Sequence, residues 1–364
     1  MTARLPGRES ARLPAIDAVR GIVMVVMTLD HSSSAFNHGR LMADGLATFR
    51  PDMVFDPLQF AIRWVTHLCA PSFVLLAGAS LALSVTRRQR SGIEGSRIDR
   101  DILIRGALLI ALDLVWMGWI WRLGLPLQLG VLYAIGVSMI GLIALRRLPA
   151  AVVGGLGLAV IAGGDALIAQ IDPTAALATA TMVPGQVGSI FFLYSFLPWT
   201  GIMLIGWAVG MRLAGPGMRV RDWLVLAAIA LVTFAVVRGA NGYGNAGMPR
   251  RDGSWIEWLH VSKYPPSLAY TGLELGIAFA LLAAVWRWAR PWKPLVVLGQ
   301  TALFYYLIHA HVLKGGALVL GVYRTEGIAA TLAGWLVMVV ALYPACHWYL
   351  AAKRRHPASV LRFL

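Results

Sequence analysis

The stretch IDAVRGIVMVVMTLDHSSSAFNH, residues 16–38, decides the fold of this chain. Residues 22–29 at its centre are almost all apolar. Arg20 lies before this run, and Asp30 and His31 lie after it. An α-helix rises about 1.5 Å per residue, which puts Arg20 and Asp30 roughly 15 Å apart in depth. Because ionisable residues inside a membrane span usually have a function, the stretch predicts a membrane helix with a functional group at each end.

The composition of the whole chain indicates a polytopic membrane protein. Of its 364 residues, 58% are hydrophobic and 13% are charged, whereas soluble domains carry about 25% charged residues. We therefore expect an all-α helical membrane bundle that occupies residues 1–364 as a single domain. The net charge of +15 fits an excess of Lys and Arg in cytoplasmic loops, so we expect no nucleic-acid partner. Cys69 and Cys346 lie in apolar runs and suggest neither a disulfide nor a CxxC site.

Ten apolar stretches are long enough to be membrane spans, each of which needs about 20 residues. They are residues 15–36, 57–85, 102–121, 125–145, 150–170, 188–211, 222–238, 266–288, 295–314 and 328–350. If the N-terminus is cytoplasmic, most of the 32 Lys and Arg fall in cytoplasmic segments. This asymmetry predicts about ten transmembrane helices with both termini cytoplasmic, in the inner membrane.

The N-terminal segment also has features of a secretory signal peptide, which would be removed. Arg4, Arg8 and Arg12 resemble the basic region of such a peptide, and residues 32–35 resemble a cleavage site. Because Arg20 interrupts the apolar run, we interpret the segment as the first span.

The pair Asp30-His31 is the strongest candidate for catalysis. A neutral imidazole beside a carboxylate is the usual general-base arrangement. Adjacent residues on a helix point about 100° apart, so Asp30 could instead serve a histidine of another span. His38 lies seven residues after His31 and would share its face if the helix continued, which makes it the second candidate. The alternative interpretation is a polar helix end that meets water.

His67 and His309 are further candidates, since each lies in the outer half of a predicted span. A lone histidine on an apolar face is more often a hydrogen-bonded packing group, which is the alternative for His67. His309 shares a helix face with Tyr305, four residues earlier, and its alternative is the aromatic interface belt or packing. No two histidines have the i,i+4 spacing of zinc-binding helices, so we expect no metal.

Arg20 and Arg105 stand out among the basic residues of the predicted cytoplasmic side. Each begins an apolar run and is followed by glycine. Arginine suits phosphate because its guanidinium group binds in a bidentate manner. The alternatives are charges that set topology or bind anionic lipid and, for Arg20, a structural ion pair with Asp17, three residues earlier.

Three acids within predicted spans keep a second function open: Asp113, Asp165 and Glu274. Proton-coupled transporters use such residues, so a small-molecule transporter or permease is the alternative function. The sequence contains no inverted repeat, which counts mildly against a transporter. A non-enzymatic membrane scaffold is the third option.

Four motifs together carry a resemblance to a known family: IDAVRGIVMVVMTLDHSSSAF, THLCAPSFVLLAGAS, VSKYPPSLAYTGLELG and GQTALFYYLIHAHVLK, in this order. They resemble the bacterial relatives of heparan-alpha-glucosaminide N-acetyltransferase, a family of transmembrane acyltransferases, over most of the chain. The resemblance implies a polytopic enzyme that takes an acyl group, usually acetyl, from cytoplasmic acyl-CoA. It implies transfer of that group to an acceptor, typically a sugar, on the outer side of the membrane.

The family's active-site histidine lies at the outer end of the first span or in the following loop, which corresponds here to His31 or His38. The eukaryotic enzyme carries Asn at the position of Asp30. We predict an O- or N-acyltransferase with His31 as the general base and Asp30 as its partner; a covalent acetyl-histidine relay is a variant. Acetyl-CoA is expected to bind through Arg20 and Arg105. The expected neighbours of the acceptor, an extracytoplasmic glycan or glycolipid, are His67, Lys263, Tyr264 and His309. Other expected partners are the lipid bilayer and, as an open alternative, a second copy in a homodimer.

Overall fold

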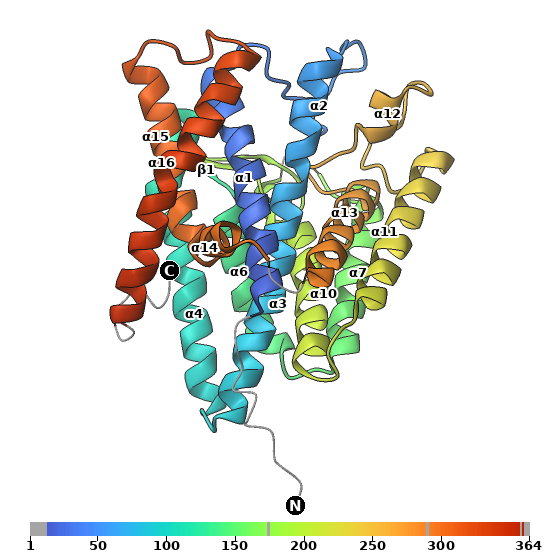
Figure 1. Ribbon diagram of the computed structural model, residues 1–364. Helices are drawn as coiled ribbons and strands as arrows, with labels where there is room; N and C mark the ends of the chain where they lie inside the picture. The colour runs from blue at the N-terminus through green and yellow to red at the C-terminus, as the bar shows by residue number, and fades with distance from the viewer. Residues whose placement is uncertain (1–12, 173–174, 289–290, 357–358, 360–364) are drawn as a thin grey trace, which may run out of the picture.

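The chain folds into a bundle of helices with one small sheet (Figure 1). The computed structural model describes residues 13–172, 175–288, 291–356 and 359. The arginines of the signal-peptide alternative lie outside these residues: Arg4, Arg8 and Arg12.

The elements follow one another as the apolar runs of the sequence predict. The helices are α1 (Pro14–Phe36), α2 (Pro57–Val65), η1 (Thr66–Leu68), α3 (Cys69–Arg90), α4 (Gly95–Ala111), the π-helical turn η2 (Leu112–Met117), α5 (Gly118–Arg122), α6 (Val131–Leu145), α7 (Ala150–Ala162), α8 (Gly164–Ile168), α9 (Ala176–Thr181), α10 (Phe196–Ala214), α11 (Val220–Ala240), α12 (Trp255–Leu259), α13 (Leu268–Arg287), α14 (Lys293–Gln300), α15 (Ala302–Val319) and α16 (Ile328–Arg355). The strands are β1 (Leu127–Leu129), β2 (Gly185–Val187) and β3 (Ile190–Phe192).

The prediction of an all-α membrane bundle is confirmed. Among the described residues, seven helices are long and apolar enough to cross a membrane, and α6 and α7 are shorter apolar helices. Helix α1 is not among the seven, because polar residues at its ends lower its mean hydropathy. The number of about ten spans therefore stays a prediction.

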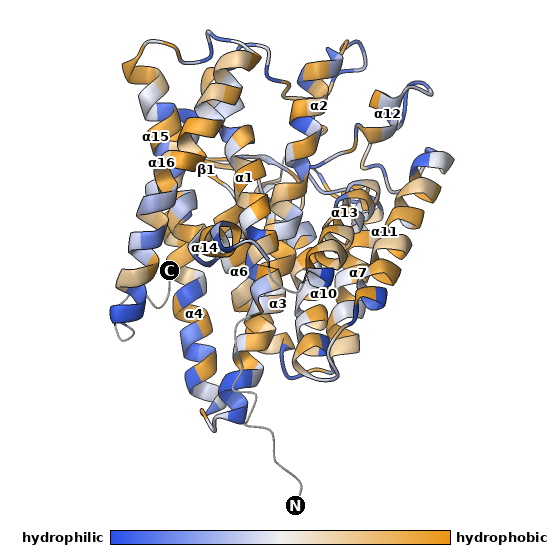
Figure 2. Cartoon of the chain, viewed as in Figure 1, coloured by the Kyte–Doolittle hydropathy of each residue, from blue (hydrophilic) through white to orange (hydrophobic). Residues whose placement is uncertain are grey.

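Apolar residues predominate along helices at the periphery of the bundle, such as α11 (Figure 2). Helix α11 exposes Ile229, Val232 and Val236, and α16 exposes Val337 and Val340. Such side chains on the outside of a helical bundle are stable when lipid surrounds them. These faces fit a protein that lies in a bilayer.

The predicted span 57–85 is interrupted toward its N-terminal end. A short 3₁₀ turn, Thr66–Leu68, separates α2 from α3. Pro71 has no N–H and therefore cannot bond to the carbonyl of His67, four residues earlier. The hydroxyl of Tyr270 donates to that carbonyl instead, over 3.1 Å. The break thus turns a backbone carbonyl toward α13.

The predicted span 295–314 is also two helices, α14 and α15, which meet at Thr301. Helix α14 lies across the start of α1 (Figure 1). A Cβ atom added to Gly299 would lie 1.8 Å from the carbonyl oxygen of Asp17, and one added to Gly21 would lie 1.9 Å from that of Leu295. Only glycine allows this approach, and it fixes the level at which α15 begins.

The hairpin between the predicted spans 102–121 and 125–145 is longer than expected. Residues 127–129 form β1, which pairs in parallel with β3, and β2 pairs antiparallel with β3. Helix α6 therefore starts only at Val131. The carboxylate of Asp113 accepts the N–H of Gly130 over 2.8 Å and that of Tyr133 over 2.7 Å, so it ties the start of α6 to η2.

Candidate active site

The centre of the site is a pair of histidines from α1 and α15. Nδ1 of His31 lies 2.6 Å from Nε2 of His309, and the ring centroids are 4.8 Å apart. Nδ1 of His309 lies 2.8 Å from the carbonyl oxygen of Tyr305. Because a carbonyl only accepts, that nitrogen carries the proton, and Nε2 of a neutral His309 must accept from His31. This assignment leaves Nε2 of His31 with a free lone pair.

Aromatic rings and one carboxylate surround His31. The Trp121 ring lies 4.7 Å from the His31 ring, and the Tyr306 ring lies 6.2 Å from it. Nε2 of His31 is 3.9 Å from Oδ2 of Asp30. Asp30 and His31 are neighbours on α1, and the polar ends of their side chains thus approach each other. The Asp30 carboxylate can therefore stabilise a protonated His31 imidazole.

Asp30 also belongs to a network of buried charges. Its Oδ1 accepts from Arg40 over 2.9 Å, from Arg63 over 2.5 Å and from the hydroxyl of Thr66 over 3.0 Å. The other side of the Arg63 guanidinium donates to Asp44. Two carboxylates and two guanidinium groups therefore balance in charge near the C-terminal end of α1.

Asp44 extends this network to the second span. Nε2 of His67 lies 3.6 Å from Oδ1 of Asp44. Burial raises the pKa of the Asp44 carboxyl, but Arg63 and His67 outweigh that effect and hold it well below its usual value. Asp44 is therefore ionised and keeps Arg63 in place.

The structure brings most of the predicted outer residues to this network, but not all of them. The N–H groups of Lys263 and Tyr264 donate to the carbonyl of Asp44 over 2.7 and 3.1 Å. His38 is exposed, and its Nδ1 lies 2.6 Å from the carbonyl oxygen of Glu326. Helix α1 ends at Phe36, so the seven-residue spacing no longer places His38 on the face of His31.

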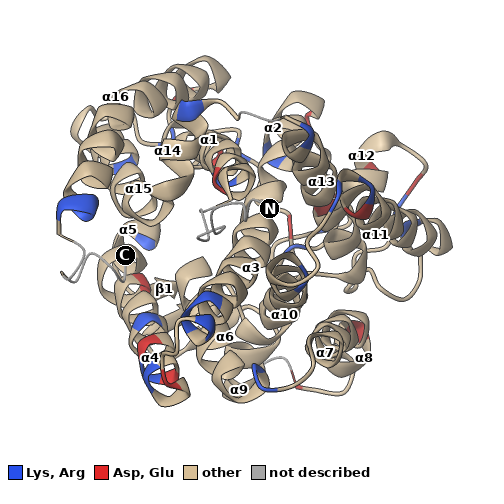
Figure 3. Ribbon diagram, turned by 60° about the horizontal axis from the view of Figure 1, so that its bottom comes forward, with Lys and Arg blue, Asp and Glu red and all other residues tan. Residues whose placement is uncertain are grey.

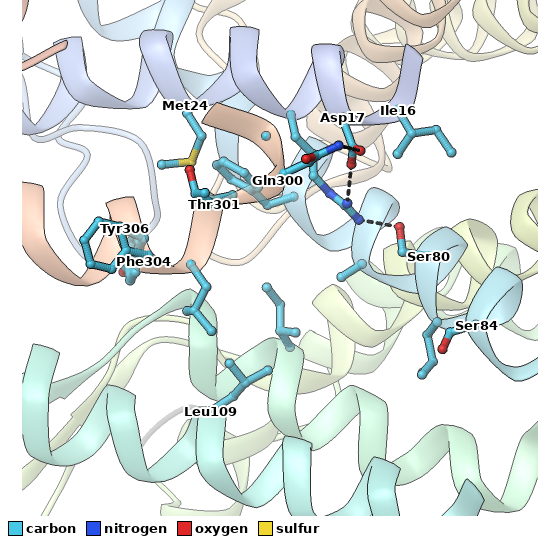
Figure 4. Close-up of a pocket in the computed structure, with 18 of the residues that line it drawn as sticks. Ile16, Asp17, Met24, Ser80, Ser84, Leu109, Gln300, Thr301, Phe304 and Tyr306 are labelled. Carbon is cyan, nitrogen blue, oxygen red and sulfur yellow. Dashed lines mark hydrogen bonds and ion pairs between the residues drawn. The ribbon is translucent and has the colours of Figure 1, made fainter. Parts of the chain in front are cut away.

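A cavity of about 460 Å³ lies between the start of α1 and the histidine pair. Figure 4 shows Met24, Leu109 and Tyr306 around the cavity that Asp17 and Ser80 also line. At its outer end, the Tyr306 ring lies 5.9 Å from that of His309. The basic residues in its wall are Arg20, Arg87, Arg105 and Lys353.

The two arginines predicted for cofactor binding, Arg20 and Arg105, both line this cavity, but they differ in their hydrogen-bond partners. Arg20 donates to Asp17 over 3.4 Å, to the carbonyl of Leu76 over 2.9 Å and to the hydroxyl of Ser80. The predicted ion pair of Arg20 with Asp17 is therefore present. Within the described ranges, no hydrogen bond or ion pair engages Arg105. Arg105 can therefore bind an anion.

Two of the three acids behind the transporter alternative have structural partners. Asp113 holds the start of α6 through backbone N–H groups. Asp165 accepts the N–H of Gly244 over 2.7 Å and that of Ala246 over 3.0 Å. Glu274 is buried, and its Oε1 has no hydrogen-bond partner among the described residues.

Arg40, Arg63 and Trp121 are site residues that sequence reasoning missed. Of these three, only Arg63 is indicated by the sequence as a candidate, because it is a charged residue inside the predicted span 57–85. Arg40 lies in a loop, and the position of Trp121 near the end of a predicted span is typical of tryptophans at the membrane–water interface. In the part of the chain that the structure describes, no group of three or more His, Cys, Asp or Glu could hold a metal ion.

Comparison with known proteins gives one match. Residues 12–242 match the family model described as heparan-alpha-glucosaminide N-acetyltransferase, catalytic. A search of curated proteins finds no match. The matched residues include Asp30, His31 and Arg63, whereas His309 lies beyond them.

Proposed function

Because the chain belongs to the heparan-alpha-glucosaminide N-acetyltransferase catalytic family, and is thus a multi-pass membrane acetyltransferase, we propose a direction for the transfer. The acetyl group moves from acetyl-CoA on the cytoplasmic side to a hydroxyl or amine of an extracytoplasmic glycan or glycolipid. The observation that carries the proposal is the cavity that has Arg105 in its wall and reaches Tyr306 beside the histidine pair.

The residues that line the cavity suit a thioester with a charged carrier. Arg20 and Arg105 supply guanidinium groups that favour phosphates, and Met24, Phe73 and Leu109 supply an apolar wall for the arm that bears the acyl group. Arg20 and Asp30 are ten residues apart on α1, which is about 15 Å of helix. A donor bound with its phosphates at Arg20 and Arg105 therefore points its thioester toward His31.

The free lone pair on Nε2 of His31 makes this residue the general base. Nε2 takes the proton from the acceptor hydroxyl or amine while the acceptor oxygen or nitrogen attacks the thioester carbonyl. The C–S bond then breaks, and the CoA thiolate takes the proton back from the His31 imidazolium. The products are the acetylated acceptor and free CoA, so the base is restored without an external reactant.

The neighbours of His31 favour this proton transfer. His309 fixes the ring through the 2.6 Å bond to Nδ1. Asp30, 3.9 Å from Nε2, favours the imidazolium that forms during the reaction. His67, Lys263 and Tyr264 lie next to Asp44 and are our candidates for contacts with the acceptor.

The test uses the full chain in proteoliposomes, with radiolabelled acetyl-CoA outside and an amino sugar as acceptor inside. His31→Ala should abolish acetyl transfer while acetyl-CoA still raises the melting temperature, because the cavity is unchanged. His356→Ala, in the exposed tail, is the matched control. Full transfer by His31→Ala would contradict the assignment, and acetyl-CoA-independent solute flux would favour the transporter.

A further inference from the structure

A second cavity, of about 390 Å³, adjoins the donor cavity between α3 and α4. The two cavities share Leu81, Ser84, Arg105 and Met139 in their walls. They therefore adjoin each other along these residues, and we call the two together the trough. The shared Arg105 stands at the junction between its two parts.

One face of α4 runs along the whole trough. Arg97, Asp101, Arg105 and Leu109 follow at intervals of four residues, so they lie on the same side of the helix. The first two line only the second cavity, and Leu109 lines only the donor cavity. The α4 side of the trough thus carries charged residues at one end and the apolar Leu109 at the other.

The two acids within α4 already have partners. Asp101 accepts from Arg88 over 2.5 Å. Asp99, on the same helix, accepts from Arg146 and Arg147 over 2.5 and 2.8 Å. Figure 3 shows basic and acidic positions close together along the ribbon of α4.

Among the described residues, Arg97 and Arg105 form no ion pair with these acids. In the described part of the chain, neither guanidinium group makes a hydrogen bond or an ion pair, and both are exposed to the trough. Eight residues separate them, which corresponds to about 12 Å along α4. Two guanidinium groups at this spacing can each hold a separate phosphate centre of one ligand.

Acyl-CoA is such a ligand, since it carries a pyrophosphate and, on the ribose of its adenosine, a 3′-phosphate. We propose that the second cavity binds the 3′-phosphoadenosine end of acyl-CoA, with Arg97 on the 3′-phosphate and Arg105 on the pyrophosphate. Ile93 and Ile102 in the same wall provide apolar contacts for the adenine ring. The inference rests on the proposed function, because it assumes that the donor enters the adjoining cavity.

The test compares acetyl-CoA with acetyl-dephospho-CoA, which lacks only the 3′-phosphate. In vesicles of neutral phosphatidylcholine, wild-type kcat/KM should be about 10- to 100-fold higher for acetyl-CoA, the effect expected of a lost charged hydrogen bond. Arg97→Gln should bring this ratio close to one and leave kcat/KM for acetyl-dephospho-CoA unchanged. Arg100→Gln, on the same helix but outside both cavities, should keep the wild-type ratio.

Other outcomes separate the possible failures. Equal use of both donors by the wild type, or the same ratio in Arg97→Gln, overturns the inference but not the acetyl transfer. An Arg97 effect that occurs only with phosphatidylglycerol in the vesicles assigns the cavity to anionic lipid headgroups and also overturns it. If no acetyl transfer occurs, the proposed function fails. The inference is then tested by binding alone: CoA should raise the melting temperature more than dephospho-CoA does, and equal shifts would overturn it.

Discussion

His31 and His309 are 278 positions apart in the chain, yet their ring nitrogens lie 2.6 Å apart. His309 is itself fixed by the carbonyl of Tyr305, 2.8 Å from its other nitrogen. A backbone carbonyl of α15 thus determines which nitrogen of His31 is free to act. The proposed base on α1 depends in this way on a helix that lies outside the matched residues 12–242.

Loss of His309 should slow the chemical step without weakening donor binding. We expect His309→Ala to lower kcat by about 10- to 100-fold, less than the 10²- to 10⁴-fold typical of a lost general base, with KM for acetyl-CoA unchanged. His309→Gln should recover part of the rate, because its amide oxygen can accept from Nδ1 of His31. Steady-state kinetics in proteoliposomes measure both parameters.

The control for this prediction is His311→Ala. His311 lies on the same helix, but its nitrogens face the carbonyls of Leu307 and Trp116. Its kcat should stay near that of the wild type. A His309→Gln variant as slow as His309→Ala would count against an orienting role for His309.

Arg63 should be much more important for stability than an exposed arginine. Its side chain is 7% exposed and lies between Asp30 and Asp44. Arg63→Gln leaves Asp44 buried without its partner, which typically costs about 3–5 kcal/mol. Thermal unfolding in detergent should show a large fall in melting temperature.

The matched control is Arg147→Gln, because Arg147 also pairs with an aspartate, Asp99, but is 68% exposed. Exposed ion pairs contribute about 0–1 kcal/mol, so this variant should melt near the wild type. Equal melting temperatures for the two variants would show that the buried network does not stabilise the outer end of α1.

The all-α membrane architecture could be predicted because it follows from the length of apolar runs. The breaks within the apolar runs could not be predicted, because tertiary contacts determine where they occur. Residues 295–314 read as one apolar span, but the contact of Gly299 with Asp17 turns α14 across α1. Residues 127–129 read as the start of a span, but their backbone pairs with β3.

The site could be predicted where a polar residue interrupts an apolar run. Asp30, His31 and Arg20 gave that signal, and all three line the site or its cavity. His309 was distinguishable from His311 only through its shared face with Tyr305. Arg40 and Asp44 lie in a loop without periodicity, so nothing local indicates that they meet Asp30 and Arg63.

The close contact between α14 and α1 predicts that one methyl group added at Gly299 strongly lowers stability. In Gly299→Ala, the new Cβ atom would lie 1.8 Å from the carbonyl oxygen of Asp17, so α14 must move away. Overpacking of this kind typically costs about 1–3 kcal/mol. Because Gly299 and Gln300 also line the donor cavity, KM for acetyl-CoA should rise together with the loss of stability.

Gly141→Ala is the matched control, since a Cβ atom there meets nothing within 4 Å. This variant should be neutral or more stable by up to about 1 kcal/mol, as expected for Ala over Gly within a helix. A Gly299→Ala protein with wild-type stability and KM would mean that α14 can shift freely.

His260 connects the two outer loops. Its Nε2 donates to the carbonyl of Ala43 over 2.8 Å, and its ring lies 4.7 Å from that of Phe55 and 5.1 Å from that of Phe49. Burial lowers the pKa of His260 below its ordinary value, and the bond to Ala43 offsets only part of this effect. The folded protein therefore keeps His260 neutral at a pH where the unfolded chain protonates it.

This difference predicts a loss of stability in mild acid. Because the folded pKa is the lower one, the stabilisation is complete above the unfolded value of about 6.5 and is lost as the pH falls toward the folded pKa. The wild-type melting temperature should fall between pH 7 and pH 5, and it should fall less in His260→Asn, whose amide can still donate to Ala43. His356→Asn, in the exposed tail, should follow the wild type. Parallel curves for the wild type and His260→Asn would assign the acid sensitivity to other groups.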